Sequence, residues 1–456
     1  MKSKFLFLIL FTLTFNSSFA QWSAPQNISP GTTAVGTNEN AGQCIAVVGD
    51  TVRITYSDRS TAMAKIMYNQ STDMGITWGT PVQLFSSLNC GFTAIASCGS
   101  SVHIVWMDSL GSDRASFYKR SSDNGATWGP TVCLDSVTKF WPGIACSNNL
   151  VIATLNKDLS GNTEVFIKRS LDTGSTWLTE QRISNATNRS EDPAINILGG
   201  DVHLSWNDKR SDTMNIYYCH SSDSGATWGP ETQLTTIDSY TSMVCLDGNH
   251  VDVPHGIRTA GAFDVWNSES NDTGSTRLPD QQLTNTPALG EIYPFMVRDG
   301  LNMHLVYIGP GGANYLYSAD GGVSWDVPLL LSASTQPFIA YTGCVLHVIF
   351  ANGGHINYMR NPTGNSNCSV LGTNNFSENN FEASVFPNPF TSEATITFSE
   401  SQKNTALKIS DAIGREIKTI NFTGRQITID LNIKSGIYFV QVSNERGTFT
   451  SKLIKE

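Results

Sequence analysis

The sequence is poor in charge and lacks the features of several protein classes. Only 15% of its 456 residues are Asp, Glu, Lys or Arg, and 29 basic against 39 acidic residues give a formal net charge of −10. No basic patch is present, so we do not expect nucleic acid as a partner. A C-x-x-C pair, a histidine cluster and the ligand spacing of an EF-hand are also missing. We therefore expect no metal site and no cofactor.

Long apolar runs are missing after the N-terminus. Two lysines precede an apolar run over residues 5–15, and Ser18-Phe19-Ala20 follows it with the small-x-small pattern of a signal peptidase site. Residues 1–20 are therefore predicted to be a secretory signal peptide. No later segment reaches 18 apolar residues, so we expect no transmembrane segment in the mature protein.

One short turn motif is abundant, because it occurs six times. The copies follow the pattern S-x-D-x-G-x-T-W, and the fifth, over residues 270–277, is degenerate because it ends in Arg277. Their aspartates are spaced by 48 to 51 residues and are Asp73, Asp123, Asp172, Asp223, Asp272 and Asp320. A period of this size indicates stacked or radially arranged units.

The motif has a physical interpretation. An Asp carboxylate that accepts backbone N–H groups and a Gly that adopts positive φ close a tight turn, and the Thr-Trp pair begins a strand and buries an aromatic ring. The pattern resembles the Asp-box, or BNR repeat, of sialidase-like β-propellers. The resemblance implies an all-β fold in which the aspartates are structural.

Four strand-like runs, A to D, surround each motif, so we predict four-stranded antiparallel blades with the motif between strands C and D. Three runs remain after the sixth motif, over residues 337–341, 345–350 and 355–360, whereas residues 22–28 look like an outer strand with nothing before it. We predict that these pieces join into a seventh blade, which removes an open sheet edge. A six-bladed ring is the alternative.

Nine cysteines are present, and their odd number and spacing fit no small disulfide framework. Cys98, Cys146, Cys245 and Cys344 fall in or just after predicted innermost strands. We interpret them as small buried apolar residues, and the disulfide pairing stays open.

The C-terminal part has a different composition. Residues 361–380 are rich in Asn, Ser, Thr and Gly, as in a linker, and separate a propeller over residues 21–360 from a module over residues 381–456. Four segments of this module, over residues 385–390, 407–415, 436–440 and 452–456, resemble the type A sorting domain of the type IX secretion system in Bacteroidetes. The resemblance implies a small β-sandwich-like domain, a periplasmic intermediate, and a protein that is secreted or attached to the outer-membrane surface. An immunoglobulin-like binding domain is the alternative, and whether the module is cleaved stays open.

Ligands are expected on the face opposite the motifs, where the B-to-C and D-to-A loops lie. Guanidinium groups bind carboxylates bidentately and aromatic rings stack on sugars, so these loops indicate a glycan or another hydroxylated ligand. The ligand-binding candidates are Arg59, Arg114, Trp141, Asp208, Arg210, Tyr240 and Arg258. Asp–Arg pairs at strand ends are alternatively exposed ion pairs of little energetic value.

The resemblance also implies a hydrolase as a second possibility. Sialidases use three arginines on the substrate carboxylate, a tyrosine nucleophile assisted by a glutamate, and an acidic residue as acid/base. The candidates for these roles are Arg59, Arg210, Arg258, Tyr293, Glu39, Glu291 and Asp58. The family's Arg-Ile-Pro motif is absent, because Arg53-Ile54-Thr55 lacks the proline.

The missing Arg-Ile-Pro motif favours ligand binding over catalysis, since proteins that resemble each other in this way share their fold more often than their activity. We predict a monomeric, exported propeller that recognises a glycan or another surface ligand. The alternatives are a sialidase-like or other glycan-active enzyme and an adhesive role.

Overall fold

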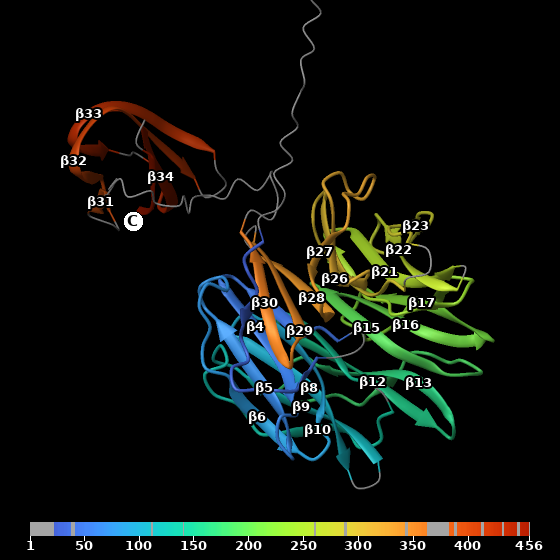
Figure 1. Ribbon diagram of the computed structural model, residues 1–456. Coiled ribbons are helices and arrows are strands. Elements are labelled where there is room, and N and C mark those ends of the chain that lie inside the picture. The colour runs from blue at the N-terminus through green and yellow to red at the C-terminus, as the bar shows by residue number, and fades with distance from the viewer. Residues whose placement is uncertain are drawn as a thin grey trace, which may run out of the picture. The chain divides into compact units, whose positions relative to one another are not determined.

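The computed structural model describes residues 22–37, 42–110, 113–139, 141–259, 261–286, 290–342, 345–362, 383–386, 390–411, 415–430, 433–444 and 447–455. Every regular element within these ranges is a β-strand, so they contain no helix able to cross a membrane. The chain divides into two compact units, residues 1–370 and 371–456 (Figure 1). The predicted signal peptide and nearly all of the predicted linker lie outside the described residues.

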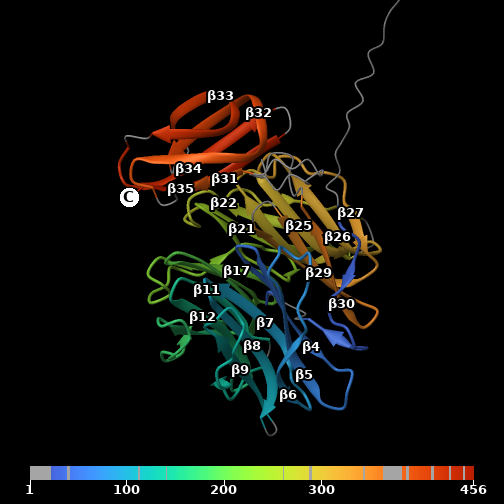
Figure 2. The ribbon, with the colours of Figure 1, turned by 90° about the vertical axis from the view of Figure 1, so that its left-hand side faces the viewer.

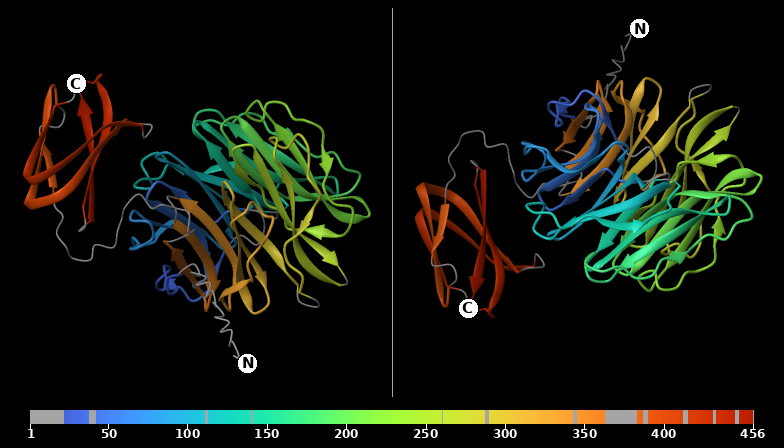
Figure 3. Two further views of the ribbon diagram at one scale, coloured as in Figure 1. Left: turned by 90° about the horizontal axis from the view of Figure 1, so that it is seen from above. Right: turned by 90° about the horizontal axis from the view of Figure 1, so that it is seen from below.

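The first unit is a β-propeller of seven antiparallel sheets arranged around a centre (Figure 2, Figure 3). Blade 1 comprises β2 (Val35–Gly36), β3 (Ile45–Val48), β4 (Thr51–Asp58), β5 (Ala64–Ser71) and β6 (Val82–Ser87). Blade 2 comprises β7 (Gly91–Cys98), β8 (Ser101–Leu110), β9 (Asp113–Ser121) and β10 (Val132–Asp135). Blade 3 comprises β11 (Gly143–Ser147), β12 (Leu150–Leu159), β13 (Asn162–Ser170) and β14 (Gln181–Arg182). Blade 4 comprises β15 (Ser190–Leu198), β16 (Asp201–Ser211), β17 (Thr213–Ser221) and β18 (Thr232–Gln233). Blade 5 comprises β19 (Ser239–Tyr240), β20 (Cys245–Asp247), β21 (His250–Thr259), β22 (Ala262–Ser270) and β23 (Gln281–Gln282). Blade 6 comprises β24 (Ile292–Asp299), β25 (Asn302–Gly309), β26 (Gly312–Ser318) and β27 (Leu329–Ser332). Strand A is the innermost strand, in two pieces in blades 1 and 5, and strands A line a central channel of about 360 Å³.

Blade 7 joins the two ends of the propeller. Its strands A to C are β28 (Thr335–Thr342), β29 (Val345–Asn352) and β30 (His355–Asn361), and the N-terminal β1 (Gln26–Asn27) pairs antiparallel with β30 as strand D. Next to β1, Ile28 is only 2% exposed and its N–H donates to the Ile356 carbonyl at 3.0 Å. The prediction of a seventh blade completed by the N-terminal strand is confirmed, and the six-bladed alternative is wrong.

Each motif closes a C-to-D turn through the same hydrogen bonds. In the second copy Asp123 Oδ1 accepts from the Ser121 hydroxyl at 2.6 Å and from the Thr127 N–H at 2.8 Å, while Oδ2 accepts from the Thr127 hydroxyl. Gly125 adopts φ 84° and donates its N–H to Ser121 Oγ at 2.9 Å. The hydrogen bonds from Ser121 and Thr127 lower the pKa of Asp123 to about 2. The carboxylate is therefore fully used in holding its own loop.

Neighbouring blades contact each other at these motifs. The hydroxyl of Tyr118, on strand C of blade 2, occupies the place that a Cβ on Gly174, in the motif of blade 3, would take. The Trp177 ring packs edge-on against the Tyr118 ring at 4.9 Å, and the Tyr118 hydroxyl lies 2.8 Å from His103 Nδ1. We call this arrangement the tyrosine–box contact.

The tyrosine–box contact occurs at four of the six motifs, since Gly225 meets Arg169 and Ile152, and Gly322 meets Met303 and Gln281, in place of a tyrosine. One of the four carries an informative substitution. Tyr68, Tyr218 and Tyr358 lie in the same way under Gly125, Gly274 and Gly75. In the degenerate copy the Arg277 guanidinium takes the place of the tryptophan and lies 4.0 Å from the centre of the Tyr218 ring. At the closure, Trp22 packs edge-on against Tyr315 of blade 6 at 5.1 Å.

One pair of cysteines departs from the sequence interpretation. Cys98, at the end of β7, and Cys146, in β11, form a disulfide with their Cα atoms 6.1 Å apart. The interpretation of these two as buried thiols is wrong, because a separation of 48 residues, close to one blade period, places them side by side on adjacent innermost strands. Cys245 is buried with a free thiol, and Cys344 lies outside the described residues.

The second unit is a small β domain with its own core. Its sheet has the order β31 (Ala383–Phe386), β32 (Glu393–Asp411), β34 (Gly436–Asn444) and β35 (Gly447–Lys455), and β33 (Glu416–Asp430) also pairs with β32. Buried apolar side chains, such as Phe390, Leu407 and Val440, fill its interior.

We expect the closure to contribute measurably to stability. Replacing Ile28 by Ala should destabilise the full-length protein by about 2–5 kcal/mol, because the side chain leaves a cavity in the propeller core. Ile76→Ala, at a position 61% exposed in the first motif, should change the free energy of unfolding by no more than about 0.5 kcal/mol. Urea denaturation measures both values, and equal effects would contradict the closure.

Glycine is expected to be required at position 174 for two reasons, its left-handed φ and the close approach of the Tyr118 hydroxyl in the tyrosine–box contact. Gly174 and Gly199 both have left-handed φ, 78° and 64°, but a Cβ on Gly199 meets nothing within 4 Å. Gly174→Ala should therefore destabilise the protein by about 1–3 kcal/mol more than Gly199→Ala, since only the first also displaces Tyr118. Thermal unfolding of the two variants makes the comparison, and equal melting temperatures would show that backbone strain alone matters.

The lowered pKa of Asp123 predicts an acid-sensitive fold. A carboxyl whose folded pKa lies below its unfolded value stabilises the protein above the unfolded pKa, and this contribution disappears as the pH falls from about 4 to about 2. Asp123→Asn should reduce the drop in melting temperature between about pH 4.5 and pH 2.5, because Asn does not titrate. An unchanged drop in this variant would mean that the box does not contribute to acid unfolding.

Candidate functional site

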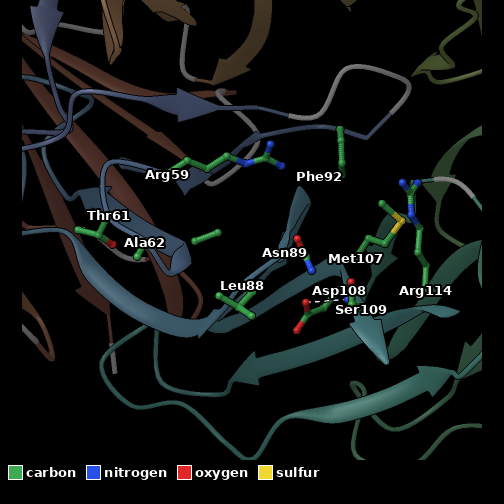
Figure 4. A pocket seen from close by; sticks show the side chains of 11 residues that line it. Arg59, Thr61, Ala62, Leu88, Asn89, Phe92, Met107, Asp108, Ser109 and Arg114 are labelled. Atoms are coloured by element: carbon green, nitrogen blue, oxygen red, sulfur yellow. Dashed lines mark hydrogen bonds between the residues drawn. The ribbon is translucent and has the colours of Figure 1, made fainter. Parts of the chain in front are cut away.

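A groove of about 470 Å³ opens between blades 1 and 2 on the face opposite the motifs (Figure 4). It is formed by the β4–β5 loop, the β6–β7 loop and the β8–β9 hairpin, which are B-to-C and D-to-A connections. Its lining residues are Arg59, Thr61, Ala62, Ala64, Leu88, Asn89, Phe92, Met107, Asp108, Ser109 and Arg114. We call it the loop-face groove. A volume of this size suits a small ligand or one or two residues of a polymer.

Arg59 and Phe92 form one wall of the groove. The Arg59 N–H donates to the Ala34 carbonyl at 2.8 Å, and its guanidinium carbon lies 5.6 Å from the centre of the Phe92 ring. A Cβ on Gly91 would lie only 2.6 Å from Arg59 Nη2, so glycine leaves room for this guanidinium. The Phe92 ring packs against the Trp141 ring, with the two ring centres 5.3 Å apart.

The conformation of Phe92 explains how its ring reaches the groove. Phe92 has φ 53°, and the pairing register of β7 shifts between Gly91 and Ala94. Such a bulge turns a side chain away from the direction that regular alternation gives it. Residues at the start of four other innermost strands share this left-handed φ, so the conformation is a repeated feature of the propeller.

Asp108 forms the floor of the groove. It is 5% exposed, and its Oδ1 accepts hydrogen bonds from the Ser87 hydroxyl and the Ser109 N–H, each at 2.7 Å. Arg114, near the start of β9, is exposed on the opposite side of the groove from Arg59 (Figure 4). The groove therefore combines two guanidinium groups, one carboxylate, small polar side chains and an aromatic wall.

The other acidic candidates at the ends of strands B are used internally. Asp58 is 6% exposed, accepts the Ser60 N–H at 2.9 Å and lies 3.5 Å from Lys65 Nζ. Asp208 is fully buried and accepts two hydrogen bonds from Arg210, at 2.8 and 2.7 Å. Burial acts to raise the pKa of Asp208, but the hydrogen bonds from Arg210 outweigh it and the pKa is lowered.

Arg210 is enclosed by its neighbours. Besides Asp208 it forms an ion pair with Glu231, and its guanidinium carbon lies 4.2 Å from the centre of the Tyr217 ring. Hydrogen bonding to Asp208 raises the pKa of Arg210. The Asp208–Arg210 pair is thus a compensated unit within blade 4.

Arg258 and Tyr240 meet on blade 5. Both contact Phe263, the Arg258 guanidinium carbon at 4.7 Å and the Tyr240 ring at 5.6 Å from its centre. Arg258 Nη1 also lies 3.4 Å from Asp238 Oδ2. The candidates therefore form separate groups: Arg59, Arg114 and Trp141 lie at or beside the loop-face groove, the Asp208–Arg210 pair lies on blade 4, and Arg258 with Tyr240 lies on blade 5.

The remaining catalytic candidates lie at the entry to blade 6 or outside the described residues. Tyr293 has φ 55° at the start of strand A, and its N–H donates to Thr241 Oγ1 at 3.4 Å. Glu291 is fully buried, and burial raises the pKa of its carboxyl group. Glu39 lies outside the described residues.

Sequence reasoning missed Phe92, Asn89 and Ser109 as groove residues. Non-glycine residues at the start of five innermost strands share left-handed φ values of 53–57°: Phe92, Asp192, Thr241, Tyr293 and Gln336. Three of them precede a proline, which is visible in the sequence. Phe92 precedes Thr93, so this sequence signal does not identify it.

Comparison with known proteins agrees with this architecture. Residues 9–253 match the BNR repeat-like domain, and residues 384–456 match the secretion system C-terminal sorting domain. The sorting domain indicates type IX secretion, so the protein is secreted or held at the cell surface. A search of curated proteins found no match.

Several solved structures are similar to this chain at low sequence identity. A polysaccharide lyase of family PL25, an ulvan lyase, is 11% identical with a TM-score of 0.52, covering 73% of this chain and 95% of that one. The same lyase bound to -[GlcA(1-4)Rha3S]- gives a TM-score of 0.51 over the same coverage, again at 11% identity. A Trypanosoma rangeli sialidase in complex with sialic acid is 12% identical with a TM-score of 0.42, covering 94% of this chain and 88% of that one. Since the BNR match extends over more than half of its length, the chain belongs to the BNR repeat-like family and ends in a secretion system C-terminal sorting domain.

Proposed function

We propose that the protein is an exported binding module that recognises a glycan in the loop-face groove. The observation that carries this proposal is the composition of the groove, in which Arg59, Arg114, Asp108 and Asn89 surround a cavity beside the Phe92 ring. Concave sites that combine an apolar wall with a few convergent polar groups are typical of ligand binding.

The chemistry of the lining suits a sugar. Sugar hydroxyls both donate and accept hydrogen bonds, and Asp108 accepts, the arginines donate, and Asn89 and Ser109 do both. The Phe92 and Trp141 rings offer a flat apolar surface beside these polar groups. A protein of the same fold, the PL25 ulvan lyase, has been solved with a bound glycan, which supports the assignment of this ligand class.

Binding is favoured over hydrolysis by the distribution of charged groups. Glycosidases generally need two acidic residues, or a nucleophile and an acid/base, on either side of one bond. Asp108 is the single carboxylate among the described lining residues of the groove. The three arginines of the sialidase-like assignment lie on blades 1, 4 and 5, and two of them are ion-paired.

The path to the cell surface completes the proposal. Residues 1–20 would direct export to the periplasm, and the propeller over residues 21–360 would act as a monomer. Residues 361–380 would link the propeller to the sorting domain over residues 381–456. The secretion machinery would bind that sorting domain.

The proposal predicts that filling the loop-face groove abolishes binding. Asn89 is exposed in the β6–β7 loop, so Asn89→Trp should obstruct the groove without disturbing the core. We expect its affinity for a glycan identified on an array to fall by about tenfold or more. Leu301→Trp, at a position 62% exposed on the face of the motifs, is the matched control and should bind normally.

The assay is binding of the full-length protein to a glycan array and to the hits by calorimetry, together with turnover of a fluorogenic sialoside. Unaltered binding by Asn89→Trp, or the absence of any glycan ligand, would overturn the proposal. Turnover that Asn89→Trp abolishes would instead support the hydrolase alternative.

A further inference from the structure

We propose that the outer edge of blade 6 is a docking site for an extended segment of another protein, which adds a strand to β27. The docking segment carries apolar side chains and is flanked by lysine or arginine. Three features of blade 6 carry this proposal: the free backbone edge of β27, the exposed apolar side chains along it, and the charges around it. The loop-face groove lies on blades 1 and 2, so this docking site is separate from it.

The strand β27 is the outermost strand of blade 6 and has a free edge. It pairs with β26, and no described strand pairs with it on the other side. Figure 2 shows β27 at the rim of the propeller. The backbone N–H and C=O groups of such an edge are available to a strand from another chain. Addition of a strand to an exposed sheet edge is a recurring mode of peptide recognition.

The side chains of β27 distinguish blade 6 from the other blades. Its first two residues, Leu329 and Leu330, are 38% and 50% exposed. The other six outer strands begin with at least one polar residue or a cysteine: Val82-Gln83, Val132-Cys133, Gln181-Arg182, Thr232-Gln233, Gln281-Gln282 and Gln26-Asn27. Polar and charged residues at a free edge discourage pairing with other chains, whereas two leucines favour it.

Exposed apolar side chains continue from β27 towards the sixth motif. Val323, in the motif, is 83% exposed and Val327 is 85% exposed, which makes them the most exposed large apolar side chains in the described part of the chain. Every residue over 323–330 except Trp325 is exposed. We call Val323, Val327, Leu329 and Leu330 the blade-6 rim. Their concentration along one stretch of chain favours a protein interface.

The charges of blade 6 indicate which kind of segment fits. The blade, over residues 292–332, has no lysine. Its single arginine, Arg298, is 8% exposed and is paired with Asp252 at 2.9 Å and with Glu269 at 3.0 Å. Asp299 and Asp326 are exposed on the same blade. Blade 6 therefore attracts a docking segment with basic ends and repels one with acidic ends.

The same charges disfavour a second copy of this chain as the partner. Pairing of β27 with the β27 of a copy would bring together two blades that expose acidic side chains and no basic ones. Each chain also has a net charge of −10, so the two copies would repel each other. The occupant of the blade-6 rim is therefore a segment of a different protein.

The first experiment measures binding of synthetic peptides to the full-length protein by fluorescence anisotropy. The probe is a peptide of alternating valine and threonine with lysines at both ends. One comparison peptide has glutamates at its ends, and another keeps the lysines but has N-methyl groups on adjacent central residues, which remove backbone donors from both of its edges. We expect the probe to bind with a Kd below about 1 mM, and each comparison peptide to bind about tenfold or more weakly.

Salt separates the two contributions to this binding. In about 0.5 M NaCl the preference for lysine over glutamate ends should shrink, because the charges of blade 6 are exposed and are screened. The effect of N-methylation should persist, since backbone hydrogen bonds do not depend on that screening. Asp326→Asn should likewise reduce the preference for lysine ends and preserve the effect of N-methylation.

A pair of matched variants tests the position of the docking site. Leu330→Lys places a charge on the free edge of β27 and should weaken binding of the probe by about tenfold or more. Gln282→Lys adds an equal charge at the second residue of β23 in blade 5, where the native side chain is also exposed, and should leave binding unchanged. Both variants should keep the melting temperature of the unaltered protein, because neither position lies in the core.

Each contrary outcome has a defined meaning. Equal affinity for the N-methylated peptide would overturn strand addition. The absence of saturable binding of the probe up to about 1 mM, or an equal loss in Leu330→Lys and Gln282→Lys, would overturn the docking site itself. Sedimentation velocity tests the second copy, since a dimer that Leu330→Lys dissociates would overturn the assignment of the rim to a different protein.

Discussion

The contact between a tyrosine of one blade and the turn motif of the next is the interaction on which the propeller depends. The tyrosine hydroxyl fills the space above a glycine that has no side chain, and the motif's tryptophan packs edge-on against the same ring. A histidine lies beside Tyr118, Tyr218 and Tyr358, and burial lowers its pKa, to about 4 in His103, so it is neutral at physiological pH. The Tyr68 hydroxyl instead donates to Gln70 Oε1. Where the tyrosine meets a tryptophan and a histidine, as at Tyr118, the contact is thus made of uncharged groups whose protonation does not change between the pH of different compartments. Because Trp22 and Tyr358 make the corresponding contacts at the closure, the same interaction operates at both ends of the propeller.

The motifs constrain one face of the propeller and leave the other free to vary. Their aspartates are consumed by hydrogen bonds within each turn, and the N–H after each aspartate donates to the neighbouring A-to-B turn, as Asn124 does to the Ser100 carbonyl at 2.8 Å. The B-to-C and D-to-A loops share backbone features, such as the hydrogen bonds from the N–H groups of Arg59, Lys209 and Arg258 to carbonyls of the D-to-A loops, but they share no set of side chains. This difference explains why arginines, acids and aromatics of unlike kinds occupy corresponding positions on the loop face of different blades. The degenerate fifth motif shows how far the constrained face tolerates change, since Arg277 still covers Tyr218.

Much of the fold could be predicted from the sequence, whereas the site could be predicted only in part. The spacing of the motif predicted the four-stranded blade, because the motif is a local pattern that repeats once per blade. The strand-like run at residues 22–28 predicted the closure of the seventh blade, because an unpaired sheet edge is unfavourable. The disulfide between Cys98 and Cys146 was missed because the blade period places the two strands side by side but does not give the register at which the two cysteines meet. Arg59 and Arg114 were recognised as candidates by residue type, but so was Arg210, whose charge is compensated by Asp208 and Glu231. Asp208 lies two residues before Arg210, so this pair was among the possible Asp–Arg ion pairs at strand ends, whereas the second partner, Glu231, is brought close only by tertiary packing. Phe92 was missed because its left-handed backbone interrupts the strand pattern that sequence reasoning follows.

The disulfide and the groove belong to the same pair of strands. Phe92 lies at the start of β7 and Cys98 at its end, while Trp141 lies just before β11 and Cys146 within it. The covalent bond therefore fixes the separation of two strands whose opposite ends carry the aromatic wall of the groove. Neighbouring blades are also held by the tyrosine–box contact between Tyr118 and Gly174, which joins blades 2 and 3 on the outer side of the same sheets. The disulfide holds the strands of the aromatic wall on their inner side, and the tyrosine–box contact holds the same blades on their outer side. The backbone that carries these side chains is therefore already ordered before a ligand binds, and less conformational entropy is lost on binding. The face that carries the motifs thus contributes to recognition indirectly, by giving the loop face a rigid support.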